Sequence, residues 1–206
     1  MKLKNSIILS ILLYFVLGSL PVFSEERIFT IGWEPWEPYQ FINKEKQLTG
    51  LDVELISIIA QQMNCKISYT QLPWKRTLSY VERGQLDLAA GASKTSEREV
   101  YAFFSNPYRD ESNVIFVLKG VSQKFPFKQL SDIKNSSFQL GITIGYHYGE
   151  AFSALMKDDA FKKHVQGVPN EPVNIMKTLK HRVHGYIGDI YAGIASFKKA
   201  RRLGSI

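Results

Sequence analysis

The stretch LDLAAGASKTSER, residues 86–98, decides the fold. Its first seven residues, Leu86 to Ala92, are small and apolar enough for a strand buried on both faces, and such strands are typical of parallel sheets with helical crossovers. The following residues change character, because Ser96 and Glu99 have the spacing of a capping box and predict a short helix that begins at Thr95 or Ser96. A buried strand followed directly by a helix start indicates an α/β protein.

The residues before this stretch alternate between strand and helix patterns. Ile28 to Gly32 has the composition of a short buried strand. Leu51 to Met63 places apolar residues at helical spacing and predicts an amphipathic helix with Asp52 on its polar face. Lys66 to Gln71 alternates like a strand, and a second helix follows Pro73. Together with the strand at 86–92, the order is β-α-β-α-β.

The same alternation restarts after a β-rich run at Asn113 to Leu118. We therefore expect two lobes, the first at residues 25–112 and the second at residues 113–206. The expected elements of the second lobe are a helix near Leu130, strands at 138–143, 165–168 and 183–187, and helices at 150–156, 173–180 and 190–197.

The N-terminus has the layout of a signal peptide. Lys2 and Lys4 precede an apolar run from Ile7 to Leu17, which is too short to span a bilayer comfortably. Small side chains near Ser24 predict cleavage after that residue, so that residues 1–24 are a signal peptide and the mature chain is exported. A membrane anchor left in place is the alternative.

The composition excludes several classes of protein. A hydrophobic content of 45% fits a globular chain, and loss of Lys2 and Lys4 would lower the formal charge of +7 to a modest +5. The single cysteine, Cys65, cannot form an internal disulfide, and we expect it to be buried. The four histidines lack metal-site spacing, and no motif for nucleic acid, phosphate or a nucleophile is present, so we expect no cofactor and no nucleic-acid partner.

Five short motifs occur in order along the chain and carry a resemblance to a known family. They are Trp36-Glu37-Pro38-Tyr39, Gly50-Leu51-Asp52-Val53, Gly84-Gln85-Leu86-Asp87, Ser93-Lys94-Thr95-Ser96-Glu97-Arg98 and Ser105-Asn106-Pro107-Tyr108. With these motifs, nearly all of the mature chain resembles the family 3 bacterial extracellular solute-binding proteins.

The resemblance implies a periplasmic-binding-protein-like (type II) fold, in which hinge strands join two lobes, each a mostly parallel sheet flanked by helices. It also implies a periplasmic protein that closes over an amino acid or similar polar solute and delivers it to the membrane subunits of an ABC importer. Family members normally return to the first lobe through a second hinge strand and final helices. Since this chain stops at Ile206, we expect that return to be missing by truncation.

In the first lobe, the resemblance and the chemistry together point to a carboxylate site. The guanidinium of Arg98 presents a rigid fork that can bind both oxygens of a carboxylate, with a surface salt bridge as the alternative role. The Ser93 hydroxyl and the backbone near Gly91 are expected to meet the same group. Thr95 either adds a donor or only caps the helix.

In the second lobe, a turn from Gly145 to Gly149 precedes a helix, and its free backbone N–H groups favour an anion. Tyr146 is the expected contributor from this turn. Asp189 follows a strand and opens into the crevice, where it is expected to bind the ligand ammonium. The alternative role of Asp189 is to cap the helix that begins at Ile190.

Aromatic residues complete the expected site. Trp36 and Trp74 stand where related binders place a ring against the ligand side chain, and Glu34 could read a cationic side chain between them. Two other functions stay open: a dehydratase-like enzyme on the same scaffold, with Glu34 or Glu37 as general acid or base, and a sensory receptor domain that passes closure to a partner.

Overall fold

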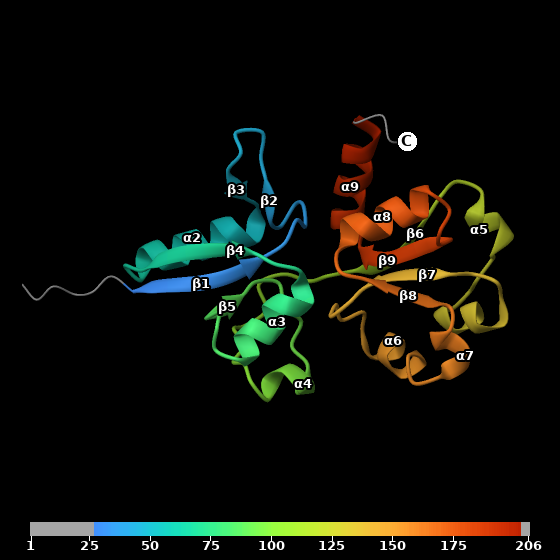
Figure 1. Cartoon of the computed structure of the whole chain (residues 1–206), viewed down its shortest axis with the longest axis horizontal. Helices are drawn as coiled ribbons and strands as arrows, with labels where there is room; N and C mark the ends of the chain where they lie inside the picture. The colour runs from blue at the N-terminus through green and yellow to red at the C-terminus, as the bar shows by residue number, and fades with distance from the viewer. Residues whose placement is uncertain (1–26, 203–206) are drawn as a thin grey trace, which may run out of the picture.

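The protein folds into two α/β lobes that lie side by side along its long axis (Figure 1). A computed structural model describes residues 27–202, so the expected signal peptide lies outside the described residues. One lobe holds a three-stranded parallel sheet, ordered β4-β1-β5, and a short β2-β3 hairpin, and the other holds a four-stranded sheet, ordered β6-β9-β7-β8. The two-lobed α/β fold expected from the sequence is confirmed.

The helices and strands follow the predicted alternation. In the first lobe they are β1 (Ile28–Trp33), β2 (Phe41–Ile42), β3 (Leu48–Thr49), α2 (Leu51–Gln62), β4 (Lys66–Gln71), α3 (Trp74–Glu82), β5 (Leu88–Ala89) and α4 (Ser96–Glu99). In the second they are β6 (Asn113–Val117), α5 (Val121–Lys124), the 3-10 helix η1 (Leu130–Asn135), β7 (Leu140–Thr143), α6 (Glu150–Leu155), α7 (Asp159–Lys162), β8 (Val165–Val168), α8 (Glu171–Leu179), β9 (Gly185–Asp189) and α9 (Ile190–Arg202).

Strand β1 is the centre of the first lobe. It pairs in parallel with β4 on one side and with β5 on the other. Helix α3 approaches β1 so closely that a Cβ on Gly32 would lie 2.5 Å from Oγ1 of Thr77. The strand expected over residues 86–92 is shorter than predicted, and Leu88 is 40% exposed instead of buried. This difference arises because β5 is an edge strand that pairs only with β1.

The orientation of α2 also differs from the prediction. Leu51 and Ile58 of the predicted apolar face are exposed, whereas Asp52 is buried. The Asp52 carboxylate accepts hydrogen bonds from the side chains of Gln40 and Arg109, both at 3.2 Å, and these bonds offset the cost of burying it. Cys65, which we expected to be buried, is half-exposed.

The second lobe has a larger apolar core. Helices α8 and α9 cover one side of its sheet, and α6 and α7 cover the other (Figure 1). Ile133, Phe138, Leu140 and Phe161 are almost fully buried in one cluster between these elements. The helix expected near Leu130 is a 3-10 helix, and its residue Ile133 anchors that segment to the core.

Within residues 27–202, the chain passes from one lobe to the other once, between α4 and β6 (Figure 1). Strand β6 begins at Asn113 and pairs antiparallel with β9, whereas the other two strand pairs of this sheet are parallel. The expected lobe boundary at residues 112 and 113 stays a prediction. In this part of the chain, no helix is both long and apolar enough to cross a membrane.

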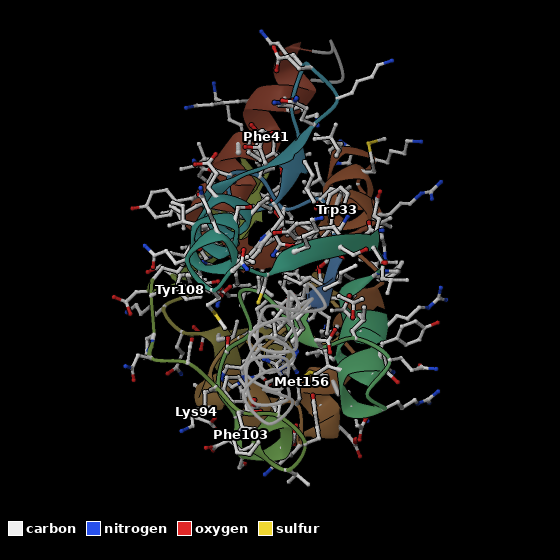
Figure 2. All side chains as sticks on the ribbon, turned by 90° about the vertical axis from the view of Figure 1, so that its left-hand side faces the viewer. Trp33, Phe41, Lys94, Phe103, Tyr108 and Met156 are labelled. Carbon is white, nitrogen blue, oxygen red and sulfur yellow. The ribbon has the colours of Figure 1, made fainter. Side chains whose placement is uncertain are left out.

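The buried core predicts where the chain is sensitive to truncation of side chains. Phe161 is 0% exposed, so Phe161→Ala should lower the free energy of unfolding by about 3–5 kcal/mol in urea denaturation. Phe103 is fully exposed at the edge of the first lobe (Figure 2), and Phe103→Ala should change stability by less than about 0.5 kcal/mol. Equal losses for the two variants would contradict the described packing.

Candidate functional site

Eight of the nine residues expected to bind a ligand line a single cavity between the lobes. They are Glu34, Trp36, Trp74, Gly91, Ser93, Arg98, Tyr146 and Asp189. Thr95 is not among the lining residues. Five residues that the sequence did not single out complete the walls: Gln40, Ala90, Glu111, Asn113 and His147.

The side chain of Arg98, a residue of the short helix α4, is buried. Its Nη1 donates to the Ser93 carbonyl at 2.7 Å, and its Nη2 donates to the Gly145 carbonyl of the other lobe at 2.8 Å. Burial lowers the pKa of Arg98, yet a guanidinium stays charged in proteins. The alternative of a surface salt bridge is wrong for Arg98, because this side chain is buried. The exposed ion pair in this region joins Lys94, which precedes α4, to Glu99 at 2.8 Å.

Thr95 acts locally. It is the N-cap of α4, and its Oγ1 accepts a hydrogen bond from the backbone N–H of Arg98 at 3.3 Å. The capping role weighed for Thr95 is therefore the one observed. By fixing the first turn of α4, Thr95 orients the Arg98 side chain toward the cavity.

The carbonyl group of Gly145, in the turn after β7, points toward the first lobe. The Gly145 oxygen accepts from Arg98 and from Nε1 of Trp74, the latter at 3.1 Å, while the Tyr146 N–H donates to the Thr143 carbonyl. Gly145 has a φ of +90°, in the left-handed region that suits glycine. The predicted binding of an anion by N–H groups of this turn stays a prediction.

Glu34 connects the two lobes. Its Oε1 accepts from the Tyr146 hydroxyl at 2.7 Å, and its Oε2 accepts from the backbone N–H of Trp74 at 3.2 Å. Burial raises the pKa of Glu34 to about 7, although both hydrogen bonds act in the opposite direction. The rings of Trp36 and Trp74 each meet Tyr146 edge-on, with centroids 6.0 and 6.3 Å away. The carboxyl group therefore lies in an aromatic corner of the cavity.

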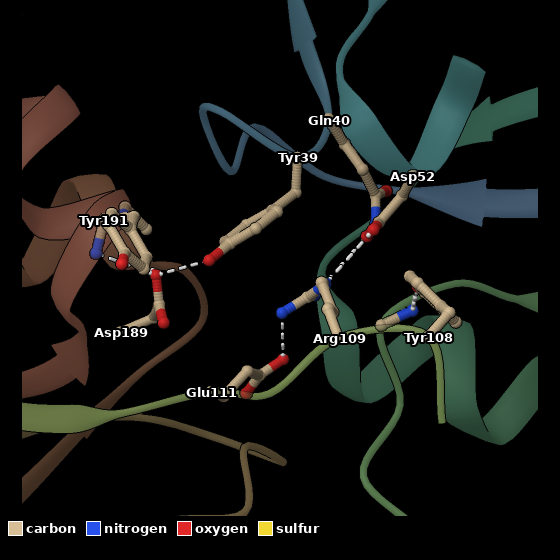
Figure 3. Close-up of polar contacts among 10 residues, drawn as sticks. Tyr39, Gln40, Asp52, Tyr108, Arg109, Glu111, Asp189 and Tyr191 are labelled. Atoms are coloured by element: carbon tan, nitrogen blue, oxygen red, sulfur yellow. Dashed lines mark hydrogen bonds and ion pairs between the residues drawn. The ribbon is translucent and has the colours of Figure 1, made fainter. Parts of the chain in front are cut away.

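Asp189 has one bonded and one free oxygen. Its Oδ1 accepts from the Tyr39 hydroxyl at 2.9 Å and from the backbone N–H groups of Tyr191 and Ala192, so that Asp189 caps α9 (Figure 3). Its Oδ2 is buried and has no hydrogen-bond partner among residues 27–202. Capping and ligand binding are therefore compatible, because they use different oxygens.

Arg109 organises the residues behind the cavity. Its guanidinium pairs with Asp52 at 3.2 Å and with Glu111 at 2.7 Å, and it lies 3.8 Å from the ring centre of Tyr39 and 4.8 Å from that of Trp36 (Figure 3). Arg109 thus holds in place the segment after β1 that carries Trp36 and Tyr39. Arg109 was not predicted from the sequence, where its one local signal is its position directly after the Ser-Asn-Pro-Tyr motif.

Glu171, at the start of α8, is a second buried acid that the sequence did not reveal. It is 3% exposed, and its Oε2 lacks a hydrogen-bond partner within the described part of the chain. Burial, followed by the nearby charge of Asp189, raises the pKa of Glu171 to about 8. The group is therefore held mostly in its neutral form at pH 7.

Comparison with known proteins assigns this geometry to a family. The model for the bacterial extracellular solute-binding proteins, family 3, matches residues 29–199. The probable histidine-binding protein of Neisseria gonorrhoeae is 26% identical over 59% of this chain and 44% of its own length. The L-cystine-binding protein TcyA of Bacillus subtilis is 25% identical over 60% of this chain and 46% of its own length.

A similar fold occurs in a solved structure, that of an ancestral arginine-binding protein bound to arginine. It aligns with a TM-score of 0.73 and 23% identity, over 84% of this chain and 75% of that chain. The fold is therefore shared. This chain spans about half the length of the curated relatives that it matches.

The raised pKa of Glu171 predicts a pH-dependent stability. Its folded-state pKa of about 8 lies above the ordinary value of 4.5, so the folded state holds a proton that the unfolded state has released. The free energy of unfolding should therefore fall as the pH rises from about 5 to 8. Glu171→Gln should reduce that fall, on the order of 2–4 kcal/mol.

The measurement is urea denaturation at pH 5 and pH 8.5, with the exposed Glu150→Gln as the matched control. The control should follow the original protein at both pH values. A Glu171→Gln variant that loses as much stability between these pH values as the control would refute the buried neutral acid.

Proposed function

This chain belongs to the bacterial extracellular solute-binding proteins of family 3, and from that premise we propose that it captures an amino acid or similar small polar solute between its lobes. The observation that carries the proposal is the placement of a guanidinium, Arg98, and a carboxylate, Asp189, on opposite lobes around one cavity. An α-amino acid presents the complementary pair of charges. The first lobe thus supplies a cation for the ligand carboxylate, and the second lobe supplies a carboxylate for the ligand ammonium.

The carboxylate of the ligand would bind to Arg98. Two carbonyl oxygens, from Ser93 and Gly145, now accept from this guanidinium, and a bidentate carboxylate is the stronger acceptor because it carries charge. The Ser93 hydroxyl and the backbone of Gly91 border the same part of the cavity. The ligand would therefore replace the Gly145 carbonyl on Arg98 and take additional bonds from the first lobe.

The ammonium group of the ligand would bind to Asp189. The free Oδ2 of Asp189 is a buried acceptor with an unused lone pair, and such an atom is costly unless it receives a donor. The other oxygen is held by Tyr39 and the start of α9. The carboxylate is thus already oriented, and ligand binding would require little reordering of its side chain.

Closure would follow from the difference in contacts between open and closed lobes. Tyr146 with Glu34, Trp74 with Gly145, and Tyr39 with Asp189 bond across the lobes in the described conformation. A ligand that contacts both lobes adds bonds only when they are together, so it shifts the population toward closure. We propose that a periplasmic form of the chain, after removal of residues 1–24, presents this closed state to the membrane subunits of an ABC importer.

One observation favours an enzyme as the second candidate function. Glu34 has a pKa of about 7 in the cavity, which suits a general acid or base. Incubation of the chain with an amino acid separates the two functions, because a binding protein returns the same molecule and an enzyme returns a product. Recovery of unchanged ligand after stoichiometric binding is the expected result.

Arg98→Ala is the direct test of the binding site. Removal of the guanidinium should weaken amino-acid binding by at least about 30-fold, because a buried charge pair typically contributes more than about 2 kcal/mol. Calorimetry with a panel of amino acids measures the affinity. Lys94→Ala is the control and should bind as before, because it removes an exposed cation that lies two residues before α4, pairs with Glu99 and is outside the cavity lining. Unchanged affinity of Arg98→Ala would refute this site.

A further inference from the structure

The cavity carries more negative charge than a simple zwitterion would neutralise. Three carboxyl groups, from Glu34, Glu111 and Asp189, and one guanidinium, from Arg98, lie in its walls. Glu111 already has a cation, because it pairs with Arg109 at 2.7 Å. If the ligand backbone occupies Arg98 and Asp189, Glu34 is the carboxyl group left without an opposite charge.

The surroundings of Glu34 suit a cation. Among the described residues, its oxygens receive hydrogen bonds only from the neutral Tyr146 hydroxyl and the Trp74 amide. The indole rings of Trp36 and Trp74 line the same cavity, and the face of an indole attracts an ammonium or a guanidinium. Guanidinium groups already lie over both rings, with Arg109 4.8 Å from the centre of Trp36 and Arg98 6.0 Å from that of Trp74. A positive group beside Glu34 would therefore meet a carboxylate next to rings that attract cations.

We propose that the solute is an α-amino acid with a positively charged side chain, and that Glu34 is the residue that selects this charge. The proposal rests on the proposed function, because it assumes that the ligand backbone binds to Arg98 and Asp189. It adds the chemical class of the ligand. Neutral amino acids of the same length would leave the Glu34 carboxyl group buried without a compensating charge, and they should bind more weakly.

A second consequence concerns protons. The pKa of Glu34 is raised to about 7 by burial, so roughly half of the chains carry a proton on Glu34 at pH 7. A cation placed beside the carboxylate lowers that pKa, and binding at pH 7 should release about half a proton. The affinity for a cationic ligand should therefore rise from pH 6 to pH 8.

Other charged or titratable groups line the cavity or interact electrostatically with Glu34. Those in the cavity wall are Arg98 on α4, Glu111 before β6, Tyr146 and His147 after β7, and Asp189 on β9. Glu171 on α8 and Tyr148 after β7 lie close enough to Glu34 for a charge interaction. Lys75 and Arg76, which follow Trp74 on α3, are exposed. The dependence of affinity on pH is therefore also measured in a His147→Asn background, with and without Glu34→Gln, so that this imidazole of the cavity wall is absent from the comparison.

A purely structural role for Glu34 is the competing explanation. The carboxyl group accepts from the first amide of α3 and from Tyr146, and it could serve only to hold the lobes together. Glu34→Gln keeps an accepting oxygen and nearly the same shape but removes the charge. A structural role predicts that all ligands are affected alike, whereas a charge-reading role predicts a change in selectivity.

The experiment measures affinities of the chain by calorimetry for L-arginine, L-lysine, L-citrulline and L-glutamine. L-Citrulline is the neutral analogue of L-arginine, and L-glutamine that of L-lysine. For whichever cationic ligand binds more tightly, wild-type protein should prefer it to its neutral analogue by at least about 30-fold, and Glu34→Gln should reduce that preference to within about 3-fold. Glu37→Gln, on the same loop but outside the cavity lining, should keep it. Calorimetry at pH 7 in buffers of different ionisation enthalpy should show proton release that Glu34→Gln abolishes.

The outcomes separate the two proposals. Tight binding of the neutral ligands with no preference for the cationic ones would overturn this inference and leave the proposed function standing. A preference for cations that Glu34→Gln retains would also overturn the assignment to Glu34. If wild-type protein binds none of the four ligands, both this inference and its premise of an amino-acid site fail.

Discussion

Burial of charge where the lobes meet is the constraint on which the rest of the structure depends. Glu34, Arg98 and Asp189 are each less than one-tenth exposed, and an ion removed from water costs several kcal/mol unless other polar groups replace the water. Here backbone groups and tyrosine hydroxyls do most of that work. The interface is therefore stable enough to form, yet Oδ2 of Asp189 remains a buried acceptor without a hydrogen-bond partner among the described residues.

The fold explains how four distant segments deliver these groups to one place. Glu34 follows β1, Ser93 follows β5, Tyr146 follows β7 and Asp189 ends β9. The carboxyl ends of parallel strands open onto one edge of each sheet, and side chains at those ends reach the crevice outside it. Both sheets face the same cavity with these edges. Each strand therefore contributes one group from a position where the sheet already orders the backbone.

The sequence predicted the parts of the molecule that local patterns encode. Strand β4 and helix α3 begin at Lys66 and Trp74 as expected. Most of the cavity-lining residues could be named from the sequence because they stand directly after strands or within motifs. Periodicity could not show which face of α2 would be buried, because the partner of Asp52 is Arg109, 57 residues away. Glu171 gave no local signal either, since its burial depends on how the second lobe packs around it. Contacts between charged residues that lie far apart in the chain were therefore what local sequence patterns could not predict.

The same long-range pairs couple the cavity to the connection between the lobes. Glu111 lies two residues before β6, in the segment where the chain crosses from one lobe to the other, and it shares Arg109 with Asp52 of the first lobe. Arg109 in turn supports the ring of Tyr39, whose hydroxyl donates to Asp189 on the second lobe. A rotation at the crossing would move Glu111 and disturb this chain of contacts. The contacts of Asp189 and the angle between the lobes are consequently set by one set of bonds, so a ligand ammonium bound to Asp189, as proposed, would also favour the closed arrangement of the lobes.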